Sequence, residues 1–161
     1  VRLTIDEDQA ADRLTITVAD NGRGMDAVAL ARAIDPFFTT RQTRHVGLGL
    51  PLLVAAAERA GGRLDIRSQP GVGTTVEAAF QFSHPDRQPL GNMADTLLAF
   101  LLSEKALDLE YVHRTAQDTF AFNTADIRQE LGSGLDFAQP VVRQWLSDFL
   151  TEGEQSVANP I

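Results

Sequence analysis

The sequence contains no cysteine, a single tryptophan, a single tyrosine and no long uninterrupted apolar run. Without cysteine the chain has no disulfide, no thiolate metal site and no cysteine nucleophile, and a reducing, cytoplasmic location fits this composition. The longest uncharged stretch, residues 46–57, is well short of the roughly 18 apolar residues that a membrane span needs. We therefore expect a cytoplasmic protein without a membrane span.

Basic residues are also too few to balance the acidic ones. The 161 residues include 14 Lys and Arg against 22 Asp and Glu, which gives a formal net charge of −8. General nucleic-acid binding needs a basic surface that displaces counterions, so we expect no nucleic-acid partner. A small anion remains compatible with this charge, because a few arginines and backbone amides can hold a phosphate locally.

The N-terminus lacks an initiating methionine and the ordered basic, apolar and small-residue segments of a signal peptide. The sequence instead begins at Val1 with the alternation of apolar and polar residues that is typical of a strand. We expect that the true N-terminus is missing from this sequence.

In the N-terminal half, apolar and polar residues alternate over 1–19, which predicts a β-hairpin, and again over 64–66 and 76–82, which predicts two further strands. Residues 26–34 are rich in Ala and Leu and predict a short helix, and a second helix is predicted over 51–60.

The character of the chain changes after residue 84. Residues 85–91 contain two prolines and indicate a linker between a domain over 1–84 and an appendage over 92–161. In the appendage we predict a helix over 93–102, a hairpin made by 107–111 and 120–122, a short helix from about 124 and a last helix from about 140. We expect Trp145, on that last helix, to be a core residue. The fold class is α+β, with strands paired mainly through hairpins.

Two glycine-rich loops flank the first helix and the irregular segment that follows it. The segment Asp20–Met25 follows a strand, and its glycines let the backbone approach a ligand closely. The carboxylate of Asp20 can accept a hydrogen bond from an exocyclic amine, which would select adenine over guanine. The segment Gly47–Leu50 lies at a helix start, where unpaired amides and the helix dipole favour an anion.

Four motifs in this order resemble the ATP-binding domain of the sensor histidine kinases of two-component systems. The motifs are Asp20-Asn21-Gly22-Arg23-Gly24-Met25, Asp35-Pro36-Phe37-Phe38-Thr39-Thr40, Gly47-Leu48-Gly49-Leu50 and Gly71-Val72-Gly73-Thr74-Thr75. The superfamily also includes gyrase, the Hsp90 chaperones and the MutL mismatch-repair proteins, and is known as GHKL or Bergerat-fold ATPases. The resemblance implies a two-layer α/β sandwich with a mostly antiparallel sheet and helices on one face.

The resemblance also implies a role for individual residues. Asp20 matches the acceptor of the adenine amine, and Thr74 matches a threonine that helps to bind adenine, usually through a water. Phe37 and Phe38 match the phenylalanine box that begins the lid over the nucleotide. In the lid, Arg41 and Arg44 are candidate phosphate partners. The cofactor-binding residues implied in this way are Asp20, Gly22, Gly24, Met25, Phe37, Phe38, Thr40, Arg41, Arg44, Gly47, Leu48, Gly49, Leu50 and Thr74.

The catalytic equipment of this superfamily lies before the first glycine box, on a helix with an Asn that holds Mg²⁺. Only the predicted hairpin precedes Asp20 here, so we assign no catalytic and no metal-binding residue, and we expect ATP with an incomplete Mg²⁺ site. The histidines, at positions 45, 84 and 113, are expected to be structural or solvated.

Several readings of function stay open. The leading one is ATP binding that sets the state of the lid and of a protein partner or a homodimer. The alternative is a histidine-type protein kinase or ATPase whose catalytic helix lies upstream of Val1, and a third is an interaction module with a degenerate site. Gly22–Ala27 also fits a dinucleotide-binding pattern, but the second glycine box and the interrupted region after the helix disfavour it.

The appendage matches no part of an ordinary histidine kinase. It is similar to the tail of small stand-alone ATP-binding proteins that are encoded beside iron-only hydrogenases in anaerobic bacteria. No pair of acids, histidine–acid pair or glycine loop in the appendage suggests a site, so we expect it to contact a partner or the nucleotide domain.

Overall fold

The computed structural model describes residues 1–35, 47–103, 107–131 and 137–158. The chain divides into two compact units. The first, Glu7–Gln88, is called the glycine-loop unit, and the second, formed by Val1–Asp6 and Pro89–Ile161, is called the C-terminal unit. The elements in chain order are β1 (Arg2–Asp8), β2 (Arg13–Asp20), α1 (Ala27–Arg32), α2 (Gly49–Arg59), β3 (Arg63–Gln69), β4 (Gly73–Gln81), α3 (Met93–Ser103), β5 (Glu110–Arg114), β6 (Thr119–Asn123), α4 (Thr124–Leu131) and α5 (Pro140–Ala158).

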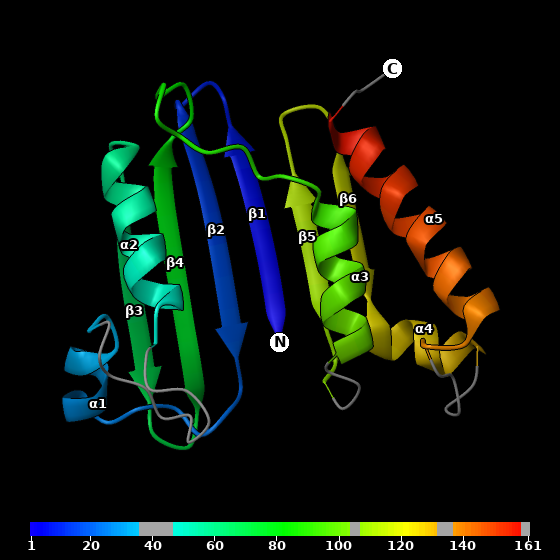
Figure 1. The fold of residues 1–161 in the computed structure, drawn as a ribbon, viewed down its shortest axis with the longest axis horizontal. Coiled ribbons are helices and arrows are strands. Elements are labelled where there is room, and N and C mark those ends of the chain that lie inside the picture. The colour runs from blue at the N-terminus through cyan, green and yellow to red at the C-terminus, as the bar shows by residue number, and fades with distance from the viewer. Residues whose placement is uncertain (36–46, 104–106, 132–136, 159–161) are drawn as a thin grey trace. The chain divides into compact units, whose positions relative to one another are not determined.

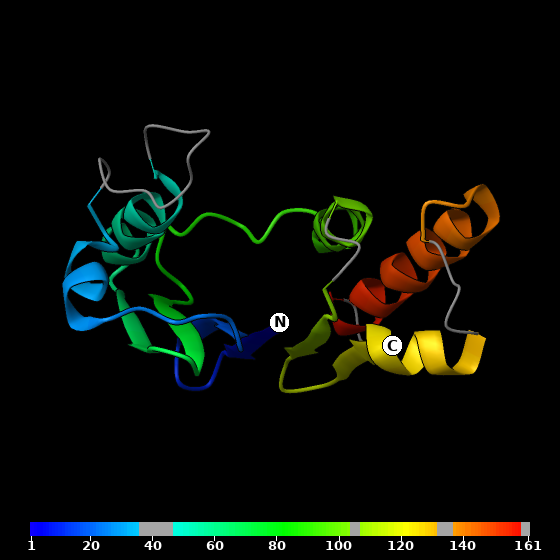
Figure 2. The same cartoon turned by 90° about the horizontal axis from the view of Figure 1, so that it is seen from below.

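In the glycine-loop unit, β4 lies between β3 and β2 and runs antiparallel to both. Helix α2 packs on β3 and β4 from one side of these strands (Figures 1 and 2). The β3–β4 pair is a hairpin, but β2 and β4 are joined only through both helices and β3. The prediction of pairing mainly through hairpins is therefore incomplete, because alternation identifies strands and not their partners.

The register of these three strands separates an apolar face from a polar one. Residues of neighbouring strands that are aligned with one another lie on the same face. We call each such row of aligned residues a rung. Three rungs are apolar: Leu14 with Phe80; Ile16 with Ala78 and Leu64; and Val18 with Val76 and Ile66. The opposite face is largely polar and includes Thr17, Glu77 and Asp65 in one row. Helix α2 covers the apolar face, where Leu14, Ala57 and Ala78 are fully buried.

In the C-terminal unit, β1 pairs with β5 in parallel and β5 pairs with β6 in an antiparallel hairpin. Ion pairs join the two parallel strands at both ends, from Arg2 to Glu110 at 2.8 Å and from Arg114 to Asp6 at 3.0 Å. The sequence pattern does not predict this parallel pairing. The division into 1–84, 85–91 and 92–161 stays a prediction.

The core of the C-terminal unit is aromatic. Tyr111 lies within 6.0 Å of the rings of both Phe120 and Phe122, measured between ring centroids. Helix α5 packs on these strands, with Leu146 and Leu150 fully buried. Trp145 corrects an expectation: it stacks on Phe149 at 5.5 Å but stays 43% exposed, because its side of the helix is only partly covered.

The predicted helices are confirmed with small shifts of their ends. Helix α2 begins at Gly49 instead of Pro51, so part of the second glycine motif is already helical. The fold is α+β, as expected for the histidine-kinase-like ATP-binding fold. None of the helices within the described ranges combines the length and the apolar composition that crossing a membrane requires.

Candidate functional site

A fourth rung, made of polar side chains, ends the apolar face of the glycine-loop unit. Asp20 of β2 is aligned with Thr74 of β4, and Thr74 is aligned with Ser68 of β3. Because side chains alternate along each strand, these three residues continue the face that carries Leu14, Ile16 and Val18. We call them the polar rung.

The apolar face becomes less covered as it approaches the polar rung. Leu14, at the far end, is 2% exposed, whereas Val18, next to Asp20, is 38% exposed. Ile66 and Val76 are half-buried. The site therefore combines a partly exposed apolar surface with hydrogen-bonding groups at one border, which is typical of sites for small molecules.

The first glycine loop is held against the β3–β4 turn. The backbone N–H of Gly22 donates to Oδ1 of Asp20 at 2.8 Å, and the backbone N–H of Gly71 donates to the carbonyl of Arg23 at 2.8 Å. Gly24 has φ +64°, and a Cβ there would lie 1.9 Å from the carbonyl oxygen of Gln69. Only glycine fits this contact, which explains the motif residue at this position.

Ser68 ties the loop to the polar rung, and the sequence analysis missed it. Its Oγ accepts from the backbone N–H of Met25 at 2.8 Å, lies 2.9 Å from Oγ1 of Thr74 and donates to the carbonyl of Gly73 at 3.0 Å. The available signal was the alternation itself, because Ser68 follows Leu64 and Ile66 on the same face.

The second glycine motif supplies the N-terminal end of α2. The N-cap residue, Leu48, has an apolar side chain and supplies no capping hydrogen bond to the helix. A Cβ at Gly49 would meet no described atom within 4 Å. Figure 1 shows that this helix end, the end of β2 and the β3–β4 turn lie at the same end of the unit.

Several predicted site residues cannot be compared with the structure. Phe37, Phe38, Thr40, Arg41 and Arg44 lie outside the described residues, as does His45. Of the described candidates, the structure brings Asp20, Gly22, Gly24, Met25 and Thr74 together around Ser68.

Within the ranges that the structure describes, no three His, Asp or Glu side chains gather in a way that could hold a metal ion. The described residues therefore provide no carboxylate or imidazole cage for a metal. A divalent ion in this unit would depend on ligand oxygens, as Mg²⁺ commonly does beside phosphates.

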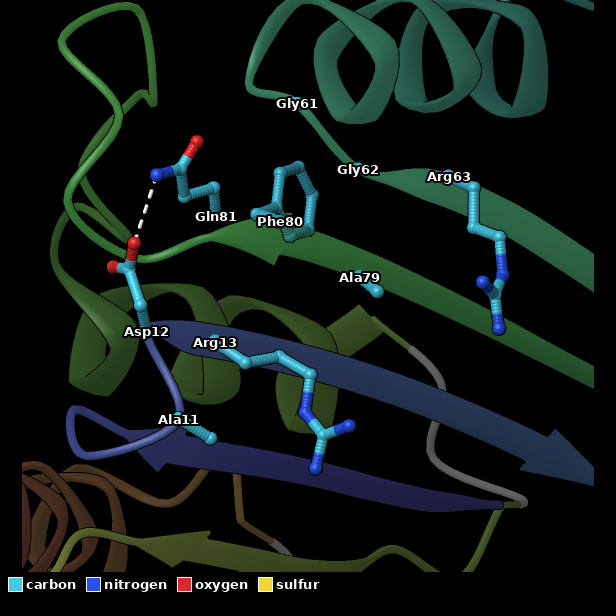
Figure 3. Close-up of a pocket in the computed structure, with 9 residues that line it drawn as sticks. All are labelled: Ala11, Asp12, Arg13, Gly61, Gly62, Arg63, Ala79, Phe80 and Gln81. Carbon is cyan, nitrogen blue, oxygen red and sulfur yellow. Dashed lines mark hydrogen bonds between the residues drawn. The ribbon is translucent and has the colours of Figure 1, made fainter.

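A hollow of about 360 Å³ lies at the opposite end of the same strands (Figure 3). Arg13 and Arg63 border it, on either side of Ala79. The carboxylate of Asp12 faces away from both, because it accepts from the Gln81 side chain at 2.8 Å and from the Ser83 backbone at 2.7 Å. These hydrogen bonds, led by that of Gln81, lower the pKa of Asp12. The hollow does not include the polar rung.

A second polar cluster lies inside the C-terminal unit. Glu154 of α5 accepts from the Tyr111 hydroxyl at 2.7 Å and pairs with Nδ1 of His113 at 3.0 Å. His113 is buried, so the expectation of a structural histidine holds. The appendage does contain a histidine–acid pair, which corrects the sequence analysis; residues 41 positions apart gave no sequence signal.

Comparison with known proteins agrees with this geometry. The family model described as histidine kinase-, DNA gyrase B- and HSP90-like ATPase matches residues 1–84. The matched region contains all three residues of the polar rung and both glycine motifs.

Several relatives are bacterial proteins named as sensors. The chain is 38% identical over 83 residues to the sensor protein IrlS of Burkholderia pseudomallei, covering 48% of this chain and 18% of that protein. It is 47% identical over 74 residues to the sensor protein kinase FleS of Pseudomonas aeruginosa, covering 46% of this chain and 18% of the relative. A C4-dicarboxylate transport sensor protein, DctB, of the same species is 38% identical over 76 residues, covering 47% of this chain and 12% of the relative. The chain thus spans less than a fifth of the length of these relatives.

Proposed function

Because the chain belongs to the family of histidine kinase-, DNA gyrase B- and HSP90-like ATPases, we propose that its polar rung binds the adenine of ATP and thereby regulates a partner. The single observation that carries this proposal is the alignment of Asp20 and Thr74 beside a partly exposed apolar surface. The proposed ligand pose places the base on that surface and its exocyclic amine at the rung.

The residues present fit an adenine nucleotide chemically. Oδ1 of Asp20 accepts a hydrogen bond from the backbone N–H of Gly22, and Oδ2 has no hydrogen-bond partner in the described part of the chain. That oxygen can accept from an amine. Burial of the base would add the hydrophobic contribution of Val18, Ile66 and Val76, at about 25 cal/mol for each Å² of apolar surface.

The phosphate end of the proposed site is the start of α2. Leu48 contributes no side-chain cap, and the backbone amides of the first turn together with the helix dipole favour a negative charge there. Arginines at 41 and 44 stay predicted phosphate partners. When bound, Mg²⁺ would neutralise phosphate charge, and we expect its site in this chain to be incomplete.

The test is the affinity for ATP of Asp20→Asn, an isosteric change that replaces Oδ2 with a donor. Loss of a charged hydrogen bond costs about 1.5–3 kcal/mol, so we expect ATP affinity to fall about 10- to 150-fold by calorimetry. Asp65→Asn, on the opposite face of the same strands, is the matched control and should bind ATP normally. Equal affinity of Asp20→Asn and the unaltered protein would refute the assignment.

A protein partner or a second copy of the chain is proposed for the C-terminal unit. Val141 and Trp145 lie one helical turn apart on α5 and are 82% and 43% exposed. Large apolar side chains exposed together commonly mark an interaction surface. Sedimentation of the protein with and without Trp145→Ala tests for the homodimer: loss of a dimer supports it, and a monomer in both samples excludes it.

A histidine-type kinase or ATPase is the second candidate, since one relative is named a sensor protein kinase. Here the catalytic helix would lie upstream of Val1. Transfer of labelled γ-phosphate from ATP to protein, measured on a longer chain and absent in Asp20→Asn, would favour this candidate. A cytoplasmic location belongs to both candidates as part of the proposal.

A further inference from the structure

We propose that Ser68 is a specificity-determining residue of the nucleotide site: its hydroxyl fixes the direction of the Thr74 hydroxyl, so that the polar rung offers the ligand hydrogen-bond acceptors only. The inference rests on the proposed adenine site and adds to it the residue that decides which base is accepted. It concerns a serine that makes no contact with the ligand in this proposal.

A serine hydroxyl has one hydrogen to donate and two lone pairs that accept. Ser68 has three partners, at 2.8, 2.9 and 3.0 Å. The backbone N–H of Met25 can only donate, and the carbonyl of Gly73 can only accept. The single hydrogen of Ser68 is therefore directed to Gly73.

The third partner, Thr74, must then donate to Ser68. If Ser68 instead donated to Thr74, its oxygen would face the Gly73 carbonyl at 3.0 Å with no hydrogen between them. With Thr74 donating, all three capacities of Ser68 are used and each contact is a proper hydrogen bond. The hydroxyl hydrogen of Thr74 is thus no longer available to a ligand.

The polar rung consequently presents only hydrogen-bond acceptors to the ligand. Thr74 keeps only lone pairs toward the ligand, and the carboxylate of Asp20 accepts hydrogen bonds by its nature. An exocyclic amine carries two hydrogens and matches two acceptors, directly or through a water. A carbonyl in the same place would face only lone pairs, so the rung rejects a base that carries an oxo group there.

The experiment compares ATP with inosine triphosphate, whose base carries a carbonyl in place of the amine and an N–H in place of the adjacent ring nitrogen. Affinities for both are measured by calorimetry on the unaltered chain and on Ser68→Ala. In Ser68→Ala the Thr74 hydroxyl is free to turn and donate to the carbonyl. We expect binding of inosine triphosphate to strengthen while ATP binding weakens, so that the preference for ATP falls about 5- to 10-fold, the effect of one hydrogen bond.

The matched control is Ser68→Thr, which keeps the hydroxyl and suits a strand. It should retain the preference of the unaltered protein. Thr74→Val added to Ser68→Ala removes the freed hydroxyl and should abolish the gain for inosine triphosphate. If Ser68→Ala does not fold, Ser68→Cys, which exchanges the hydroxyl for a weakly bonding thiol, takes its place.

The outcomes separate this inference from the proposed function. A parallel loss of both affinities in Ser68→Ala, with the preference unchanged, means that Ser68 only supports the loop through Met25, and overturns the inference alone. Failure of the unaltered chain to bind ATP overturns the proposed function and this inference with it. A gain for inosine triphosphate supports the inference, because a general structural defect weakens both ligands.

Discussion

At the scale of residues, Gly24 and Gly71 hold similar backbone angles in very different surroundings. Both have positive φ, +64° and +75°, but a Cβ at Gly71 would meet no described atom within 4 Å. Gly71→Ala therefore measures conformational strain alone, which costs about 1–2 kcal/mol. Gly24→Ala adds a collision with the Gln69 carbonyl oxygen, which would lie 1.9 Å from the new Cβ. We therefore expect Gly24→Ala to lower the free energy of unfolding by more than Gly71→Ala does.

Urea unfolding of the two glycine variants checks this prediction. A larger loss in Gly24→Ala means that the first glycine loop is fixed by its contact with the β3–β4 turn. Equal losses in both variants would contradict the close approach of Gly24 to Gln69.

Single residues of the site differ in how far the sequence identifies them. Asp20, Gly24 and Thr74 stand in motifs of recognisable order, so the sequence alone predicts their roles. Ser68 stands in no such motif. Its role arises from contacts with Met25, 43 positions away, and with Thr74, which only the strand register brings together.

At the scale of elements, helix α5 packs on β6 through a glycine. A Cβ at Gly153 would lie 2.2 Å from the Phe120 ring. In a free helix, Gly→Ala is stabilising by about 1 kcal/mol. Here we expect Gly153→Ala to destabilise the protein by about 1–3 kcal/mol, because Phe120 is itself buried and cannot move aside freely.

Thermal and urea unfolding of Gly153→Ala, of Phe120→Leu and of the double variant form the test. Relief of the collision should make the double variant more stable than the sum of the single losses predicts. Strict additivity, or a stabilised Gly153→Ala, would show that the helix is not held this closely against β6.

Periodicity predicted the longer helices well, because α2 and α5 bury one side over several turns and α5 begins at a clear signal, Pro140. Strand partners were predicted less well. Nothing in the alternation of residues 1–5 shows that β1 pairs in parallel with β5, more than a hundred positions later. Partner choice depends on which edge the rest of the chain leaves available, and that is a property of the folded state.

At the scale of the whole molecule, the proposed nucleotide site and the pairing of β1 belong to different units. The polar rung lies within Glu7–Gln88, whereas Val1–Asp6 belongs with the C-terminal unit. A chain cut after residue 91 would therefore retain every described site residue but lose β5, the strand that pairs in parallel with β1. Stability and ligand affinity should respond differently to this cut.

We expect the chain of residues 1–91 to be less stable and more prone to aggregate, because the β1 positions from Arg2 to Asp6 lose their hydrogen-bonded neighbour and an edge becomes exposed. A second truncation, 7–91, removes these β1 residues and tests whether they cause the aggregation. In both, the affinity of the folded fraction for ATP should stay within a few-fold of the full chain, as measured by calorimetry after circular dichroism confirms folding. A folded 1–91 or 7–91 chain that binds no ATP, while the full chain does, would mean that the C-terminal unit helps to build the nucleotide site.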